Sequence, residues 1–172
     1  TSAAGHFLAA GGAFVLFHPA RRLYHAMNDQ ERAIVGLINR ARGERGLRAL
    51  ACDGRMNAAA RRHAADLAQH PGLLHIGSDG STGGKRLFDA GYRWESWNEV
   101  VGWGFDGSPE QMVAWWLMSP DHMPKLLDPA MTDVGAGYAF GVAPWFHYWA
   151  IDFAAGDSGA AGAYLPGIMG GG

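Results

Sequence analysis

The sequence predicts one α+β domain in which helices lie on both sides of a sheet, an α-β-α arrangement. Two helices with strong start signals occupy the first half of the chain, and two apolar strands joined by a short turn close the second half. With 172 residues, 48% hydrophobic and 17% charged, the chain can bury one full core. We expect the domain to span residues 28–154, after an apolar extension at 1–27 and before a Gly-rich tail at 155–172.

Both early helices carry their own start signals. Asn28 and Glu31 match a capping box, in which the side chain of each residue bonds the backbone N–H of the other. Asp53 is a good N-cap for the second helix. Apolar residues at helical spacing give each helix one buried face, with Ile34, Leu37, Ile38 and Ala41 on the first and Met56, Ala59, Ala60, Ala64 and Leu67 on the second. His63 lies on or near the second face, and we interpret it as a core or boundary histidine rather than a ligand.

The middle of the chain alternates loops with short elements. His75 falls in a loop, and residues 77–80 predict a turn in which backbone donors and short oxygen-bearing side chains face inward. Residues 83–90 predict a short helix, and residues 94–101 predict a strand that carries Glu99. His75 and Glu99 are therefore both expected close to the ends of regular elements, where functional side chains often converge.

A second pair of helix starts follows. Ser108-Pro-Glu-Gln111 combines an N-cap, a first-turn proline and a glutamine at the third position. The buried side of this helix is expected to contain Met112, Val113, Trp116 and Leu117. Ser119-Pro-Asp-His122 repeats the start signal, so we expect a new helix with His122 at its third position. The positive end of that helix would favour neutral imidazole.

The last two strands form an antiparallel hairpin. The apolar segments are Asp133 to Phe140 and Trp145 to Phe153, and Gly141-Val-Ala-Pro144 supplies the turn between them. Aromatic residues lie on both faces of the second strand, which we therefore expect to be covered on both sides. The tail after residue 154 is expected to be mostly irregular.

Residues 7–17 form an apolar run that is too short for a bilayer span of about 20 residues and lacks the basic segment that precedes a signal-peptide core. Three interpretations stay open: packing on its own domain, docking on a protein partner or membrane surface, or a trimmed targeting remnant.

The charge distribution argues against nucleic acid as a partner. Residues 1–93 hold 13 basic and 7 acidic residues, whereas residues 94–172 hold 1 and 9. Basic and aromatic residues lie mainly in opposite halves, so no basic groove with aromatic platforms is expected. Cys52 is the single cysteine, which excludes an internal disulfide and a cysteine-based zinc knuckle.

Several short pieces, in this order and spacing, resemble the bacterial form of the CAP superfamily, also called SCP-like or pathogenesis-related-1-like. They are His75-Ile-Gly-Ser-Asp-Gly-Ser81, Asn98-Glu99, Ser119-Pro-Asp-His122 before Leu126-Leu127-Asp-Pro129, Val134-Gly-Ala-Gly137, and Tyr148-Trp149 ahead of Asp152-Phe153. The resemblance covers residues 28–153. It implies a three-layer α-β-α sandwich with an antiparallel central sheet, and an extracytoplasmic protein.

The resemblance also implies a cleft where the family places two histidines and two glutamates, sometimes with a divalent metal. His75, Glu99 and His122 match three of the four positions, while the second glutamate is replaced by Ser119 and the arginine that often follows the second histidine by Met123. Both departures lower the charge of the site. The expected ligand-binding residues are His75, Ser78, Asp79, Trp97, Glu99, Trp103 and His122.

The chemistry of this cleft stays open between three interpretations. Two histidines and one glutamate match an open three-ligand site for a divalent metal such as zinc, with His75, His122 and Glu99 as ligands. The same residues can form a hydrogen-bonded cluster that ties the strand to the helices. They can also serve a metal-dependent hydrolase as catalytic residues, although neither HExxH nor a Gly-x-Ser-x-Gly elbow is present.

We therefore expect a non-enzymatic, extracytoplasmic CAP-domain protein that binds a partner or ligand through the cleft. Most tryptophans are expected in the core, but Trp94, Trp97 and Trp103 are close to Glu99 and could line a groove for a lipid, glycan or peptide. A related hypothesis is an accessory or structural subunit of a larger, membrane-associated assembly, with residues 7–17 as the docking element. The alternative is a metal-dependent hydrolase using His75, Glu99 and His122.

Overall fold

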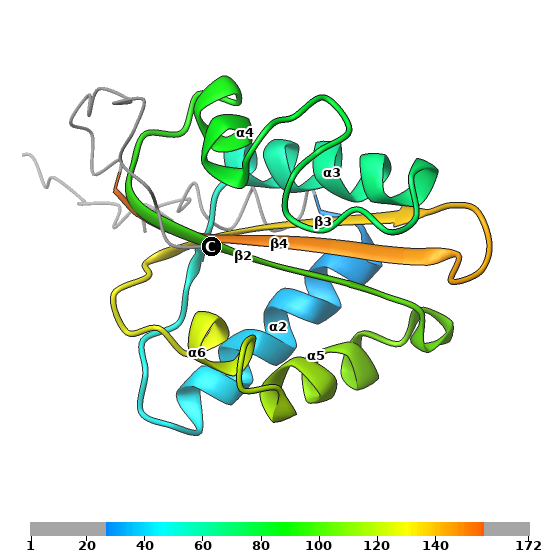
Figure 1. Ribbon diagram of the computed structural model, residues 1–172. Coiled ribbons are helices and arrows are strands. Elements are labelled where there is room, and N and C mark those ends of the chain that lie inside the picture. The colour runs from blue at the N-terminus through cyan, green and yellow to red at the C-terminus, as the bar shows by residue number, and fades with distance from the viewer. Residues whose placement is uncertain (1–26, 157–172) are drawn as a thin grey trace, which may run out of the picture.

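A computed structural model describes residues 27–156 and confirms the α-β-α sandwich. Helices α3 (Gly54–Gln69) and α4 (Gly83–Asp89) cover one face of the sheet. Helices α2 (Asp29–Gly43), α5 (Pro109–Met118) and α6 (Met123–Leu126) cover the other face (Figure 1). A short 3-10 helix, η1 (Phe105–Gly107), leads into α5. The predicted N-terminal extension, including residues 7–17, and most of the C-terminal tail lie outside the described residues.

The sheet has four strands in the order β1-β3-β4-β2. They are β1 (Ala51–Cys52), β2 (Trp94–Trp103), β3 (Asp133–Phe140) and β4 (His147–Gly156). The β2–β4 and β3–β4 pairs are antiparallel, but β1 pairs with β3 in parallel. The prediction of a purely antiparallel sheet was therefore wrong in this detail. The chain between α2 and α3 runs along β3 for two residues, where the N–H of Ala51 donates to the carbonyl of Thr132, and so short a strand leaves no periodic pattern.

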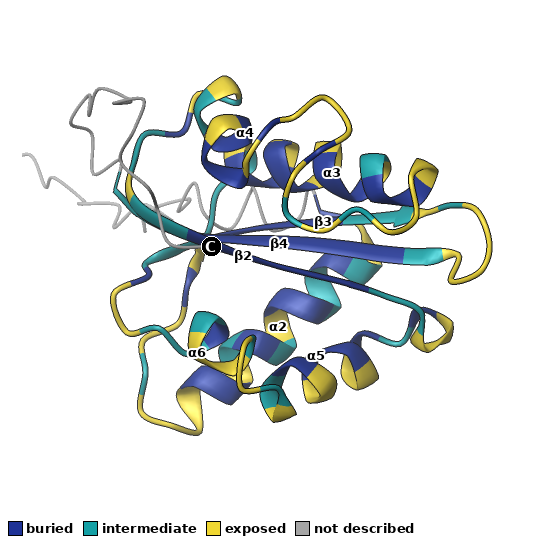
Figure 2. Ribbon diagram, viewed as in Figure 1, coloured by how far each residue is buried: buried dark blue, intermediate teal, exposed yellow. Residues whose placement is uncertain are grey.

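The predicted caps form as expected. The Asn28 side chain accepts from the N–H of Glu31, and the Glu31 side chain accepts from the N–H of Asn28. Asp53 caps α3, and Ser108 caps α5. The predicted inward residues of α3 are all buried, and β4 is buried along most of its length between the two helical layers (Figure 2).

Helix α3 lies very close to the sheet because glycine residues of β3 face it. A Cβ atom added to Gly135 would lie 2.3 Å from the backbone of Met56, and one added to Gly137 would lie 2.3 Å from the backbone of Ala60. The backbone of α3 therefore packs directly on β3, with no side chain between them. This close approach brings the next turn of α3, with His63, down to the sheet.

The layer below the sheet is held by a conventional apolar core and one buried arginine. Ile34, Ile38, Val100, Met112, Trp116 and Phe153 are among the buried residues of that core. Arg42 of α2 is fully buried and donates to the carbonyls of Leu126 and Asp128 at 2.8 and 2.9 Å. These bonds satisfy carbonyls at the end of α6 and thereby fix the segment that carries His122.

We predict that Gly137→Ala destabilises the domain by about 1–3 kcal/mol, because the new methyl group would overlap the backbone of α3. Gly43→Ala is the matched control, since a Cβ at Gly43 has no atom within 4 Å and alanine is the better helix former. Urea denaturation of both variants measures the free energy of unfolding. Equal stabilities for the two variants would refute the close packing of α3 on β3.

Candidate functional site

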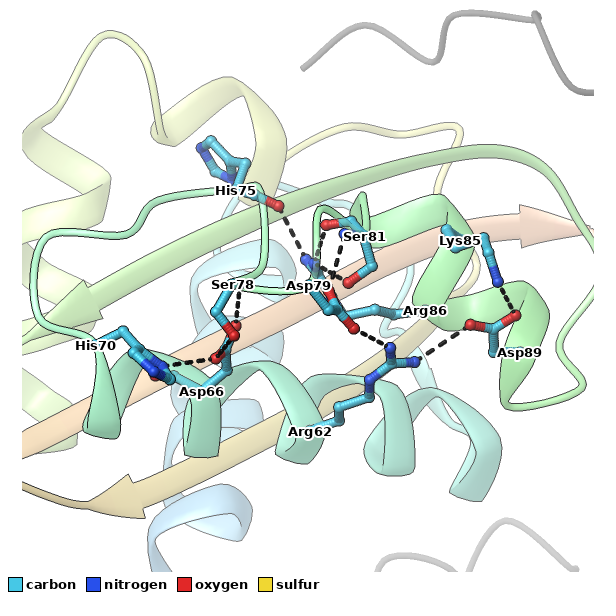
Figure 3. A network of polar contacts seen from close by, with 10 residues as sticks. All are labelled: Arg62, Asp66, His70, His75, Ser78, Asp79, Ser81, Lys85, Arg86 and Asp89. Atoms are coloured by element: carbon cyan, nitrogen blue, oxygen red, sulfur yellow. Dashed lines mark hydrogen bonds and ion pairs between the residues drawn. The ribbon is translucent and has the colours of Figure 1, made fainter.

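The loop that carries His75 is fixed to α3 by short polar contacts (Figure 3). Asp66 accepts from the backbone N–H and the hydroxyl of Ser78 at 2.7 and 2.6 Å, and it also faces the ring of His70 at 2.9 Å. Asp79 accepts from the N–H of Ser81 at 2.9 Å. The turn predicted at residues 77–80 is therefore present, but its carboxylate and hydroxyl groups bond to the loop itself and to helix α3.

Arg62 extends this network to α4. Its guanidinium pairs with Asp79 of the loop and, at 3.2 Å, with Asp89 at the end of α4. Asp89 also accepts from Lys85 one turn earlier. All of these side chains are at least 32% exposed, so each pair contributes little to stability by itself.

Glu99 of β2 is the centre of the site and is almost fully buried. One oxygen accepts from Nδ1 of His75 at 2.9 Å, and the other accepts from Nη2 of Arg86 at 2.6 Å. Arg86 is itself buried and donates to the carbonyls of Ser81 and His75. Burial alone would raise the pKa of Glu99, but the His75 hydrogen bond and the charge of Arg86 lower it below its ordinary value.

His63 contacts the same carboxylate from α3 but is not a ligand-facing residue. It is fully buried, with Nε2 2.7 Å from the carbonyl of Leu74 and 3.8 Å from Glu99. Burial lowers the pKa of His63, so the ring is neutral and Nε2–H donates to Leu74. This structure agrees with the interpretation of His63 as a core histidine.

His122 reaches the site from the opposite layer. Its Nδ1 lies 2.7 Å from the hydroxyl of Ser119, and its ring centroid lies 4.9 Å from that of Trp115. The prediction that His122 is the third residue of a helix was wrong, because residues 120–122 form turns and α6 begins only at Met123. Its pKa is nevertheless lowered, by burial first and by the charge of Lys125 second.

A cavity of about 620 Å³ lies along the outer side of β2, between the His75 loop above and the α5–α6 segment below. Its lining is mostly apolar and consists of Leu74, His75, Val101, Gly102, Trp103, Gly104, Phe105, Trp115, Asp121, His122, Lys125 and Trp145. Trp103 and Trp145 pack at 5.4 Å between ring centroids, and Phe105 and Trp115 at 6.2 Å. Two imidazoles therefore meet in an aromatic-walled cleft.

The strand edge beside this cleft is partly closed. Lys125 donates to the carbonyl of Glu99 at 3.2 Å, and the indole of Trp116 donates to that of Val101 at 3.1 Å. These side chains occupy carbonyl groups that a further strand would need, so the cleft is not arranged for pairing with an extended peptide along these residues.

The structure brings only part of the predicted set together. His75, Trp103 and His122 line the cavity, and Glu99 lies behind His75. Trp97 does not line it: its ring packs so tightly on α4 that a Cβ at Gly83 would lie 2.6 Å from it. Trp97 and Trp103 project from the same face of β2, so the difference is their position along the strand: Trp97 lies against α4, whereas Trp103 lies at the cavity. Ser78 and Asp79 bond toward α3, as described above, and also lie outside the cavity lining.

Two buried charged residues were missed by sequence reasoning. Arg86 lies in a short helix whose pattern gives no sign of which side faces the sheet. Asp152 carried a stronger signal, because it is an isolated carboxylate within an apolar strand. Trp115 and Trp145 were interpreted as core residues, but they are 41% and 38% exposed at the cleft.

The three predicted metal ligands do not fit a divalent metal. Both oxygens of Glu99 are already bonded, one of them to a guanidinium that would repel a cation. Nδ1 of His75 faces Glu99 and Nδ1 of His122 faces Ser119, so each ring offers only Nε2 and the set supplies two ligand atoms instead of the three that the predicted site needs. Across residues 27–156, no group of three or more His, Cys, Asp or Glu side chains is arranged to hold a metal ion. The second interpretation, a hydrogen-bonded cluster, describes the His75–Glu99 half of the site.

The fold defines a three-layer α-β-α domain of the SCP type. The family model described as "CAP: Cysteine-rich secretory protein family" matches residues 35–153, so the chain belongs to this family. Despite that description, the chain has one cysteine, Cys52. A comparison with curated proteins finds no match.

Solved structures of similar fold come from several bacteria. An extracellular protein containing an SCP domain from Bacillus anthracis is 22% identical, with a TM-score of 0.65, over 78% of this chain and 43% of that one. An outer surface protein from Borrelia burgdorferi is 19% identical, with a TM-score of 0.63, over 70% of this chain and 88% of that one. A cysteine-rich secretory protein from Staphylococcus aureus is 17% identical, with a TM-score of 0.56, over 73% of this chain and 38% of that one. At these identities the likeness shows the fold. Among the described residues, none of the helices has both the length and the apolarity to cross a bilayer.

We predict that Arg86→Met destabilises the domain by about 3–5 kcal/mol, because it leaves the buried Glu99 carboxylate without its cation. Arg62→Met is the matched control from the same network and should cost no more than about 1 kcal/mol, since its partners are exposed. Chemical denaturation at pH 7 compares the two. Similar losses in both variants would contradict the central role of Arg86.

Proposed function

We propose that this protein is an extracytoplasmic, non-enzymatic CAP-domain protein that binds a ligand in the cleft beside β2. The observation that carries the proposal is the aromatic-walled cavity with His75 and His122 in its lining. Its volume of about 620 Å³ lies within the range of about 300–1,000 Å³ for small-molecule pockets, and a mostly apolar lining with a few polar groups is typical of them.

The lining indicates the kind of ligand. Trp103, Trp115 and Trp145 offer flat apolar surfaces, which favour an aromatic or aliphatic body. The two imidazoles offer hydrogen bonds to one polar group on that body. Asp121 and Lys125 carry opposite charges and give the cleft no strong preference for a charged ligand.

The local chemistry favours binding over catalysis. Glu99 is held by Arg86 and His75, which opposes a role as a general base. Burial raises the pKa of the Cys52 thiol to about 11, which opposes a role as a nucleophile. Ser119 and His122 form a hydroxyl–imidazole pair, but Ser119 is not part of the cavity lining, and this pair lacks the carboxylate that orients the imidazole in a hydrolytic triad.

Two further parts of the proposal concern the location of the protein and the role of residues 7–17. The extracytoplasmic location is supported by family membership and by the extracellular and outer-surface proteins that share the fold. The docking role of residues 7–17, on a protein partner or a membrane surface, is supported by their apolar sequence and by the adjacent Arg21-Arg22. An accessory role in a membrane-associated assembly would follow from it.

We predict that anilinonaphthalene sulfonate, which has an aromatic body and one polar end, binds saturably in the cleft at one site per chain. Trp115→Ala should weaken this binding about tenfold through loss of an aromatic wall. Phe140→Ala is the control, because Phe140 is 68% exposed but does not line the cavity. Fluorescence titration measures both. A loss caused by Phe140→Ala and not by Trp115→Ala would place the probe on the surface and overturn the cleft as the binding site.

We predict that deleting residues 1–22 leaves the free energy of unfolding of the domain unchanged but abolishes docking. Flotation with anionic phospholipid vesicles and recovery of co-purifying proteins measure the two forms of docking, and urea denaturation measures stability. If the truncated protein keeps all vesicle and partner binding, the docking proposal fails. A lower stability would instead favour packing of this segment on its own domain.

A further inference from the structure

Asp152 is the second buried carboxyl group beneath the cleft. It lies in the middle of β4 and is fully buried. In the antiparallel pairing of β2 with β4, Asp152 is directly opposite Glu99. Directly opposite residues project from the same face of a sheet with Cβ atoms about 4.5–5.5 Å apart. The two carboxyl groups therefore meet between the sheet and the α3–α4 layer.

No hydrogen-bond donor in the described part of the chain reaches Asp152, and Arg86 offsets only part of a negative charge there. Neither of its oxygens has a hydrogen-bond partner among residues 27–156. Its other cross-strand neighbour, Gly135 of β3, has no side chain to offer. The surrounding charged or titratable groups are Glu99 from β2, Arg86 from α4 and His63 from α3, with His75 beyond Glu99.

The charges of this cluster do not balance if both carboxyl groups are ionised. Arg86 supplies one positive charge and bonds to Glu99, whereas the buried ring of His63 is neutral. A second buried negative charge, close to the first and without a hydrogen-bond donor, would be strongly unfavourable. Burial first, and the charge of Glu99 second, raise the pKa of Asp152 well above its ordinary value.

We propose that Asp152 and Glu99 form a buried proton-holding pair, in which Asp152 stays protonated and donates its O–H to Glu99. Glu99 then carries one negative charge, accepts hydrogen bonds from Arg86, His75 and Asp152, and leaves the cluster neutral overall. Asp152 is therefore a positioning residue: it acts on the cleft only through Glu99, which holds the ring of His75. Because an ionised Glu99 only accepts hydrogen bonds, Nδ1 of His75 must carry a proton and Nε2 is left for a ligand. This last consequence depends on the proposed function of the cleft, whereas the proton site does not.

The pH dependence of stability tests the pair. In the unfolded chain an aspartate ionises near pH 3.9, whereas the folded protein would keep the proton on Asp152. The contribution of Asp152 to wild-type stability should therefore fall as pH rises above about 4, by up to tenfold in the unfolding equilibrium constant per pH unit, until the pKa of folded Asp152 is reached. Asp152→Asn keeps the shape and a hydrogen-bond donor but has no proton to lose, so its stability relative to the wild type should rise over that range.

Asp79→Asn is the control, because the pKa of Asp79 is lowered whereas that of Asp152 is raised. Hydrogen bonds from Ser81 and Arg62 hold the pKa of Asp79 below its ordinary value, so its carboxylate is ionised in both states above pH 5. Denaturant unfolding from pH 5 to 8, with a chelator present, should give Asp79→Asn a curve parallel to the wild type. The stability curve of Asp152→Asn should instead diverge from that of the wild type, with the variant gaining relative stability as pH rises. Parallel curves for all three proteins would show that folded Asp152 is ionised and would overturn the pair.

A measurement on the wild-type protein covers the case in which Asp152→Asn fails to fold. Carbon-13 labelling of aspartate side chains allows each carboxyl group to be followed by NMR. One resonance should keep the chemical shift of a protonated acid at pH 7, outside the ordinary titration range of aspartate. If every aspartate resonance at pH 7 has the shift of a carboxylate, the proposal is wrong, whatever ligand the cleft binds.

Discussion

The ion pair between Arg86 and Glu99 is the interaction on which the site depends. It joins α4 to β2 inside the protein, and both of its partners also contact His75. Arg86 donates to the carbonyl of His75, and Glu99 accepts from the ring of the same residue. One buried pair thus fixes both the backbone and the side chain of His75. Such a pair stabilises only when most of its hydrogen-bonding capacity is used, and here Arg86 also bonds the carbonyls of Ser81 and His75 while Glu99 also bonds the ring of His75.

Much of the fold was predictable because its signals are local. The caps at Asn28, Asp53 and Ser108 act within one helical turn, so the residues that identify a helix start are adjacent in sequence. The hairpin of β3 and β4 was equally predictable, since two apolar segments flank a short turn in the sequence. Strand β1 could not be predicted, because two residues that pair in parallel with a distant strand leave no periodic signal in the sequence.

The site was only partly predictable because convergence is a property of the whole fold. His75, Glu99 and His122 were identified by resemblance to a family pattern, and two of them line the cavity. No local pattern shows that Arg86 faces inward, since a helix of seven residues has too few turns to define a face. Trp145 was assigned to a strand, but β4 begins at His147 after Phe146 adopts a φ of 60°. Trp145 is consequently outside the strand and lines the cavity.

The internal cation also explains how this cleft differs from a metal site. A carboxylate and two imidazoles facing solvent would attract a divalent ion, because the ion would balance their charge and occupy their lone pairs. Here Arg86 supplies the balancing charge from within the protein, and the group bonded to Nδ1 of His122 is the neutral hydroxyl of Ser119. With Glu99 neutralised beneath it, the cleft offers apolar area and imidazole hydrogen bonds rather than net charge. On the proposed function, binding there would depend mainly on the removal of apolar surface from water, which selects a ligand by shape and hydrophobicity.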